Sequence, residues 1–121
     1  MRSVAGPLPP WLTVSTSPAP AVVDGRACRT RAAFFEEAAR ALRLPGYFGR
    51  NWDALTDCLR DTARVLIVEH AEELLGGEPP EQFAVLLAVL GDAADAGLTV
   101  TLCTDPDREA LLRQRIAAAL P

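Results

Sequence analysis

The amino-acid sequence predicts an α/β protein in which helices pack on a parallel β-sheet. Three observations indicate this class. Strand-like and helix-like stretches alternate along the chain, the run Val65–Val68 is wholly apolar, and glycines or prolines separate successive stretches. Strands that alternate with helices are joined by right-handed crossovers, which make neighbouring strands parallel. The 121 residues, half of them hydrophobic, suffice for one domain with its own core.

Three short stretches have the composition of strands: 21–23, 65–68 and 98–103. The turn signal Asp24-Gly25 closes the first of them. The continuous apolar run at 65–68 predicts a strand that is buried on both faces. A fourth strand-like stretch, Trp11–Ser15, interrupts an N-terminal arm rich in proline, serine and alanine, and it can add an edge strand to the sheet.

Helical stretches are expected between and after these strands, at about 31–44, 52–60, 70–75, 80–96 and 106–119. Thr30, Asn51 and Asp105 stand at N-cap positions, where a short polar side chain accepts a hydrogen bond from an unpaired backbone N–H. Pro45-Gly46 ends the first helix, and Gly97 closes the long fourth one.

Acidic residues are concentrated in the middle of the chain. The sequence has 12 arginines, no lysine and 16 acids, for a net charge of −4. Residues 53–109 alone hold three arginines and thirteen acids, a net charge of −10. Such a segment repels phosphate backbones, so we expect no nucleic-acid partner. It attracts a basic protein or a cationic ligand; the alternative is a solvated acidic surface without a partner.

The sequence indicates neither a membrane protein nor an enzyme. Its longest apolar run, Phe83–Leu90, is far shorter than the ~20 residues that span a bilayer. The proline-rich N-terminus lacks the apolar region of a signal peptide, so we expect a soluble, cytoplasmic protein. No phosphate-binding, nucleophile-elbow or zinc-protease motif occurs, and His70 is the only histidine, so no cofactor or metal is expected. A metal-assisted enzyme would depend on Asp53 and Asp57, and two carboxylates on one helix supply too few ligands.

The three cysteines, Cys28, Cys58 and Cys103, are odd in number and show no CxxC spacing. Each lies in an apolar stretch. We therefore expect three reduced, buried thiols that act as small hydrophobic side chains.

Asp53, Asp57 and Asp61 recur every four residues, which places them on one face of the short helix expected at 52–60. Like charges at this spacing destabilise an isolated helix slightly, so the row is either tolerated in solvent or kept for a cationic partner. The preceding loop carries Tyr47 and Phe48. Tyrosine beside a charged patch is a typical interface anchor, although either aromatic residue can instead cover the core.

The stretch from Leu44 to Leu59, LPGYFGRNWDALTDCL, closely resembles the central signature of the barstar family, intracellular inhibitors of barnase-like ribonucleases. Matches at 22–25 and 96–101 extend the resemblance over about 20–104. It implies a three-stranded parallel sheet flanked by helices. The chain is thus expected to comprise a proline-rich extension at 1–20, a barstar-like domain at 21–104, and an extra C-terminal helix at 105–121 that packs on the same domain.

The resemblance also implies roles for three acidic side chains. Asp57 is similar to the aspartate that enters the nuclease cleft and takes the place of the substrate phosphate. Asp53 is similar to the neighbouring acid that pairs with a basic residue at the rim. Asp92, on the long helix, aligns with an acidic interface position that is usually a glutamate.

The remaining interface positions that the resemblance implies lie in the loop before the acidic helix. Tyr47 resembles the aromatic residue that packs over the nuclease's catalytic base. Gly49 and Asn51 match loop positions that touch the partner through backbone and side chain. No catalytic residue is implied.

Three departures from the family pattern accompany these matches. Thr56 stands where barstar has a tryptophan, Ala96 replaces a further interface acid, and Arg50 adds a positive charge where the pattern has an acid. They indicate a partner other than barnase itself, or weaker binding to it. We expect a non-enzymatic inhibitor, monomeric when unbound, of a basic, barnase-like ribonuclease. The alternative is an immunity or regulatory protein that uses the same acidic face on a basic toxin or other basic protein that is not a ribonuclease.

Overall fold

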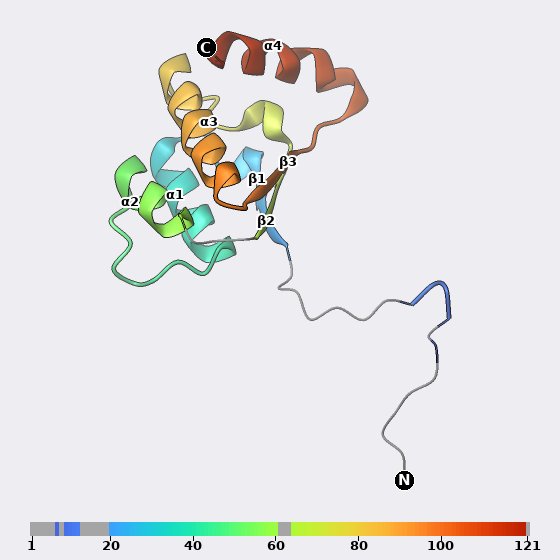
Figure 1. The fold of residues 1–121 in the computed structure, drawn as a ribbon. Coiled ribbons are helices and arrows are strands. Elements are labelled where there is room, and N and C mark those ends of the chain that lie inside the picture. The colour runs from blue at the N-terminus through green and yellow to red at the C-terminus, as the bar shows by residue number, and fades with distance from the viewer. Residues whose placement is uncertain (1–6, 8, 13–19, 61–63, 121) are drawn as a thin grey trace.

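A three-stranded parallel sheet lies at the centre of the computed structural model, which describes residues 7, 9–12, 20–60 and 64–120. The strands are β1 (Ala21–Asp24), β2 (Val65–Glu69) and β3 (Thr99–Leu102), in the order β1-β2-β3 (Figure 1). Both pairs are parallel, and Val68 stands beside Val23 on one side and Leu102 on the other. The predicted α/β class with three parallel strands is confirmed.

The edge strand expected at Trp11–Ser15 is not formed by the part of it that the structure describes. Trp11 lies in a turn that the Leu12 N–H closes by donating to the Pro9 carbonyl oxygen at 3.0 Å, and its side chain is 80% exposed. Thr13, Val14 and Ser15 lie outside the described residues.

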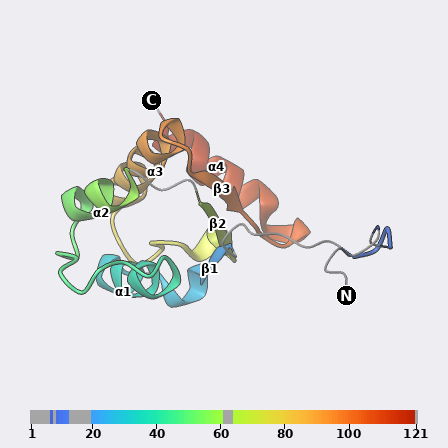
Figure 2. The same cartoon turned by 60° about the horizontal axis from the view of Figure 1, so that its bottom comes forward.

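Among the described residues, helices cover one face of the sheet, and the expectation that 65–68 is buried on both faces is wrong. Leu66 and Val68 are buried, whereas Val65 is 38% exposed and Ile67 is half-buried. Figures 1 and 2 show that α1, α2 and α3 all lie on the same side of the sheet. A wholly apolar strand can be buried on both of its faces. Burial of the second face, however, requires a second layer of helices on that side of the sheet.

Helix α1 (Arg31–Ala41) begins as predicted and ends early. The Thr30 hydroxyl accepts a hydrogen bond from the Ala33 N–H at 3.1 Å, as expected of an N-cap. The helix stops before Pro45-Gly46 because Arg43 adopts a left-handed conformation with φ of 53°. This turn lets the Leu44 N–H donate to the Ala39 carbonyl oxygen at 3.0 Å, which satisfies a carbonyl of the last turn.

The other helices are α2 (Trp52–Leu59), α3 (Pro80–Asp95) and α4 (Glu109–Ala119), with short 3-10 turns at Ala71–Glu73 and Pro106–Arg108. Gly97 follows α3 with φ of 120°, a conformation that favours glycine. Asp105 is the N-cap residue of the turn that leads into α4, as predicted, with Pro106 at the first position. Its carboxylate, however, makes no capping hydrogen bond with a described residue. Helix α4 packs against α3 and the turn at Ala71–Glu73.

The cysteines differ in burial, which corrects the expectation of three buried thiols. Cys28 is fully buried, Cys58 is half-buried and Cys103 is exposed. Cys103 directly follows β3. Because side chains alternate between the two faces of a strand, it lies on the same exposed face as Thr101. Burial, with a smaller effect of the Glu37 carboxylate, raises the pKa of the Cys28 thiol to about 12.

This difference predicts a clear order of thiol reactivity in the native protein at neutral pH. Cys103 is expected to react quickly with a chromogenic disulfide reagent, and Cys28 only after unfolding, because a buried thiol with a raised pKa offers neither access nor thiolate. Mass spectrometry of labelled peptides measures each site. Labelling of Cys28 at the rate of Cys103 in the native protein would contradict the burial of Cys28.

Candidate functional site

The loop before α2 is folded back onto the start of that helix by Asn51. The Asn51 Oδ1 accepts a hydrogen bond from the Ala54 N–H at 2.8 Å, which confirms its predicted role as N-cap. Its Nδ2 donates to the Gly49 carbonyl oxygen at 3.2 Å. One side chain thus fixes the position of the loop relative to the helix.

Trp52 anchors the start of α2 to two neighbouring helices, through ring packing on one and a hydrogen bond to the other. The Trp52 ring lies 4.8 Å from the Phe35 ring and 5.9 Å from the Phe34 ring, centroid to centroid, both on α1. The Trp52 Nε1 donates to the Gln82 Oε1 of α3 at 3.0 Å. Helix α2 is therefore tied to two neighbouring helices, a clamp that no sequence pattern indicates because its members are far apart in the chain.

The two aromatic residues of the loop have opposite environments. Phe48 is only 4% exposed and packs against Phe35, with ring centroids 6.0 Å apart. Tyr47 is 85% exposed. The ambiguity in the sequence is thereby resolved: Phe48 covers the core, and Tyr47 presents its ring and hydroxyl to solvent beside α2.

Asp53 and Asp57 lie on the exposed side of α2, whose opposite side buries Leu55 and Leu59. The Asp57 side chain is 75% exposed, and the Arg60 Nη2 lies 3.8 Å from its Oδ1. An ion pair between two such exposed groups is weak and leaves the carboxylate accessible. Asp61, the third aspartate of the row, lies outside the described residues.

Asp92 reaches the same region from a different helix. Helices α2 and α3 pack side by side, and Asp92 is exposed near the end of α3. A hollow of about 290 Å³ lies between the two helices and is lined by Thr56, Arg60, Asp92 and Ala93. Thr56 donates its hydroxyl to the Trp52 carbonyl oxygen at 2.9 Å. Its small side chain borders the hollow at the position where the resemblance noted in the sequence implies a tryptophan.

Arg50, the positive charge added within the loop, is engaged with α1. Its guanidinium pairs with Glu36 and also donates to the Phe48 carbonyl oxygen at 3.1 Å. The hydrogen bond from Arg50 lowers the pKa of the Glu36 carboxyl. This pair offsets the charge of Arg50 locally, and no short-range pattern in the sequence identifies it because the two residues are fourteen positions apart.

Within the described residues, no group of three or more His, Cys, Asp or Glu side chains is arranged to hold a metal ion. In the same part of the chain, no helix is both long enough and apolar enough to cross a membrane.

The sheet order and the exposed acidic side of α2 define a small parallel α/β protein with a carboxylate-bearing helix on its surface. A family model described as Barstar (barnase inhibitor) matches residues 19–114. The chain therefore belongs to the barstar family, as the motif at 44–59 predicts. This is an inhibitor family whose members bind barnase-like ribonucleases. A comparison with curated proteins found no match.

Proposed function

We propose that the protein inhibits a basic, barnase-like ribonuclease by placing the exposed side of α2 and the adjoining loop in the nuclease's active-site cleft. The observation that carries this proposal is the exposure of Asp53 and Asp57 on a helix whose other side is buried and clamped by Trp52. Membership of an inhibitor family supports it at the level of the class.

The chemistry of phosphodiester cleavage explains why such a surface inhibits. A ribonuclease site stabilises the charge that develops on phosphorus-bound oxygens, so it is lined with cationic groups. Carboxylates held at phosphate positions satisfy these groups without offering a bond to cleave. Because helix geometry and the aromatic packing of Trp52 fix the carboxylates beforehand, little conformational entropy is lost on binding.

In this proposal Asp57 occupies the centre of the interface, with Asp53 and Asp92 nearer its edge. Tyr47 packs on the nuclease surface, since its exposed ring combines apolar area with a polar end. Gly49 presents its backbone, and Asn51 both shapes the loop and offers its remaining amide hydrogen-bonding capacity.

An inhibition titration tests the proposed function. RNA cleavage by a barnase-like ribonuclease is measured at increasing concentrations of the protein, and we expect activity to fall to zero at one equivalent. Binding to a basic protein that leaves RNA cleavage intact would instead support the alternative, an immunity or regulatory role against a basic target that is not a ribonuclease. The absence of inhibition at micromolar concentration would contradict the proposal.

The acidic segment predicts a salt effect on the rate of association. Residues 53–109 carry a net charge of −10, and the screening length falls from ~30 Å at 0.01 M salt to ~8 Å at physiological ionic strength. Stopped-flow association with the nuclease is therefore expected to slow steeply over this range, while dissociation changes much less. An association rate independent of salt would indicate that the acidic segment is only a solvated surface.

A further inference from the structure

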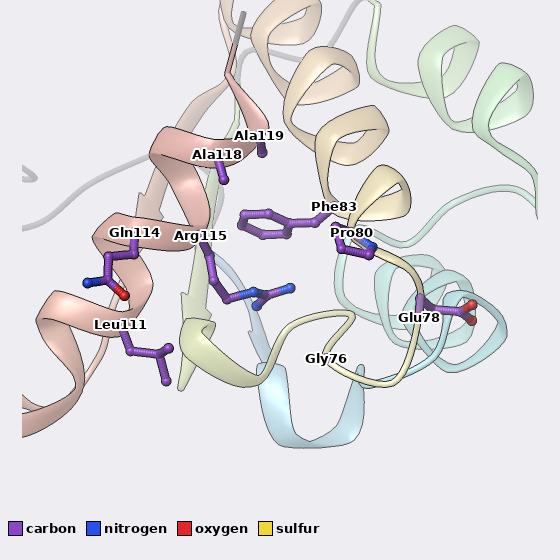
Figure 3. Close-up of a pocket in the computed structure, with 9 residues that line it drawn as sticks. All are labelled: Gly76, Glu78, Pro80, Phe83, Leu111, Gln114, Arg115, Ala118 and Ala119. Carbon is purple, nitrogen blue, oxygen red and sulfur yellow. The ribbon is translucent and has the colours of Figure 1, made fainter.

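A second concave site lies between α4 and the beginning of α3, at the N-terminal end of the helix whose C-terminal part carries Asp92. The hollow has a volume of about 370 Å³. Its walls are largely apolar, with Pro80 and Phe83 on one side and Leu111 and Ala118 on the other (Figure 3). This volume falls within the ~300–1,000 Å³ that is typical of small-molecule sites.

The guanidinium of Arg115 reaches from α4 into this hollow and is held there. Figure 3 shows it extending beneath the Phe83 ring toward the loop at Gly76. The Arg115 Cζ, the carbon of the guanidinium, lies 4.3 Å from the Phe83 ring centroid, and the Arg115 Nη1 donates to the Glu72 carbonyl oxygen at 3.0 Å. These contacts fix the plane of the guanidinium and leave Nε and Nη2 as further donors.

The carboxylates near Arg115 are engaged by other groups. Glu72, Glu73 and Glu78 each accept a short hydrogen bond. Their donors are the Thr104 hydroxyl for Glu72, Arg29 for Glu73 and the Arg31 N–H for Glu78, each at 2.7 Å. Glu73 also lies 3.7 Å from Arg108. Among the described residues, Arg115 has no carboxylate within ion-pair distance, although Glu73 is close enough to act on it electrostatically.

A half-buried cation without a carboxylate partner is poorly stabilised, because burial removes part of its hydration. Consistently, burial lowers the pKa of the Arg115 guanidinium. An incoming anion would restore the lost stabilisation through a charge-assisted hydrogen bond. Glu78, the acid on the rim, points away from the guanidinium in Figure 3, so the cationic and acidic ends of the hollow are separate.

We propose that this hollow binds a small organic acid, with the carboxylate on Arg115 and an apolar body between Phe83 and the α4 side chains Leu111 and Ala118. The carboxylate accepts hydrogen bonds from the guanidinium, and the ligand's aromatic or aliphatic group covers the apolar walls. The site is separate from the acidic side of α2, since its lining residues come from α4, the beginning of α3 and the loop before it, and none comes from α2.

A comparison of two ligands of the same shape tests the charge requirement on the unaltered protein. The full chain is titrated with 3-phenylpropionate and with its neutral amide, 3-phenylpropionamide, and binding is followed by NMR. We expect the carboxylate to shift the methyl signals of Leu111 and Ala118 and the Nε–H signal of Arg115. The amide is expected to bind about tenfold more weakly or worse, because it lacks the charge that pairs with the guanidinium.

Two arginine variants of α4 provide the matched comparison. Arg115→Gln is expected to weaken 3-phenylpropionate binding about tenfold, whereas Arg113→Gln is expected to leave it unchanged. Arg113 is exposed, pairs with Glu109 at 2.7 Å and does not line the hollow. Melting curves report whether each variant is folded. If Arg115→Gln does not fold, the carboxylate and amide comparison decides the question alone.

Three results would overturn the proposal. The first is equal affinity for the acid and its amide, and the second is unchanged binding by a folded Arg115→Gln variant. The third is tighter binding of N-acetylglycylphenylalanine than of 3-phenylpropionate, which would identify the C-terminus of a peptide rather than a small acid as the ligand.

Discussion

Asp57→Ala is expected to weaken inhibition of the cognate ribonuclease by at least about a hundredfold. In the proposed complex the Asp57 carboxylate is buried among cationic groups of the nuclease, and its removal leaves those groups unpaired. Truncation of a buried, hydrogen-bonded charge at an interface typically costs about 2–5 kcal/mol. Charge pairs of barnase–barstar complexes are themselves among the interactions for which such costs are known. Inhibition constants measured at fixed ionic strength give the effect.

Two other aspartates serve as comparisons for Asp57. Asp53→Ala is expected to have a smaller effect, since a charge at the rim contributes about 1 kcal/mol or less. Asp107→Ala removes an exposed aspartate near the start of α4, away from α2, and should leave inhibition unchanged. The melting temperature of Asp57→Ala should stay level or rise slightly, because repulsion with Asp53 is relieved. Inhibition like the wild type would contradict the central place of Asp57 in the interface, and an unfolded variant would show that Asp57 is structural.

Gly25→Ala is expected to lower the free energy of unfolding by about 3 kcal/mol, a large effect for the addition of one methyl group. Gly25 is buried in the turn after β1, where a Cβ atom would lie 2.2 Å from the His70 carbonyl oxygen and 2.9 Å from its carbon. Both are backbone atoms beside β2, so neither can move aside cheaply. Urea unfolding monitored by circular dichroism measures the loss, which should also lower Tm by roughly 10 °C or more.

Gly46→Ala is the matched control for this prediction. An added Cβ atom at Gly46 meets no described atom within 4 Å, and the residue lies in an exposed loop. Its free energy of unfolding should stay within about 0.5 kcal/mol of the wild type. Equal stability of the two variants would contradict the close approach of Gly25 to His70.

The elements that the sequence predicted well depend on local interactions. The caps Thr30 and Asn51 were identifiable because a capping side chain bonds to the backbone only three residues ahead. The parallel order followed from the alternation of strands and helices. Burial could not be predicted in the same way: the exposure of Val65 and Cys103 depends on which face of the sheet the helices cover.

The candidate site likewise has some features that local sequence spacing predicts and others that depend on contacts between distant segments. The four-residue spacing of Asp53 and Asp57 indicated a shared helix face, and the structure places both on the exposed side of α2. The position of Asp92 beside α2 could be inferred only through the family resemblance, since it depends on how two helices pack. The pairing of Arg50 with Glu36 was not predictable, because a loop and a helix meet there.

Competition with a nucleotide tests most directly whether α2 takes the place of substrate phosphate. The dissociation constant of the protein for a catalytically inactive barnase-like ribonuclease is measured at increasing concentrations of a nucleoside 3′-monophosphate that fills the active site. We expect the apparent dissociation constant to rise as the nucleotide concentration rises, because protein and nucleotide compete for the same cationic groups. An unchanged dissociation constant, with protein, nuclease and nucleotide in one complex, would contradict the account.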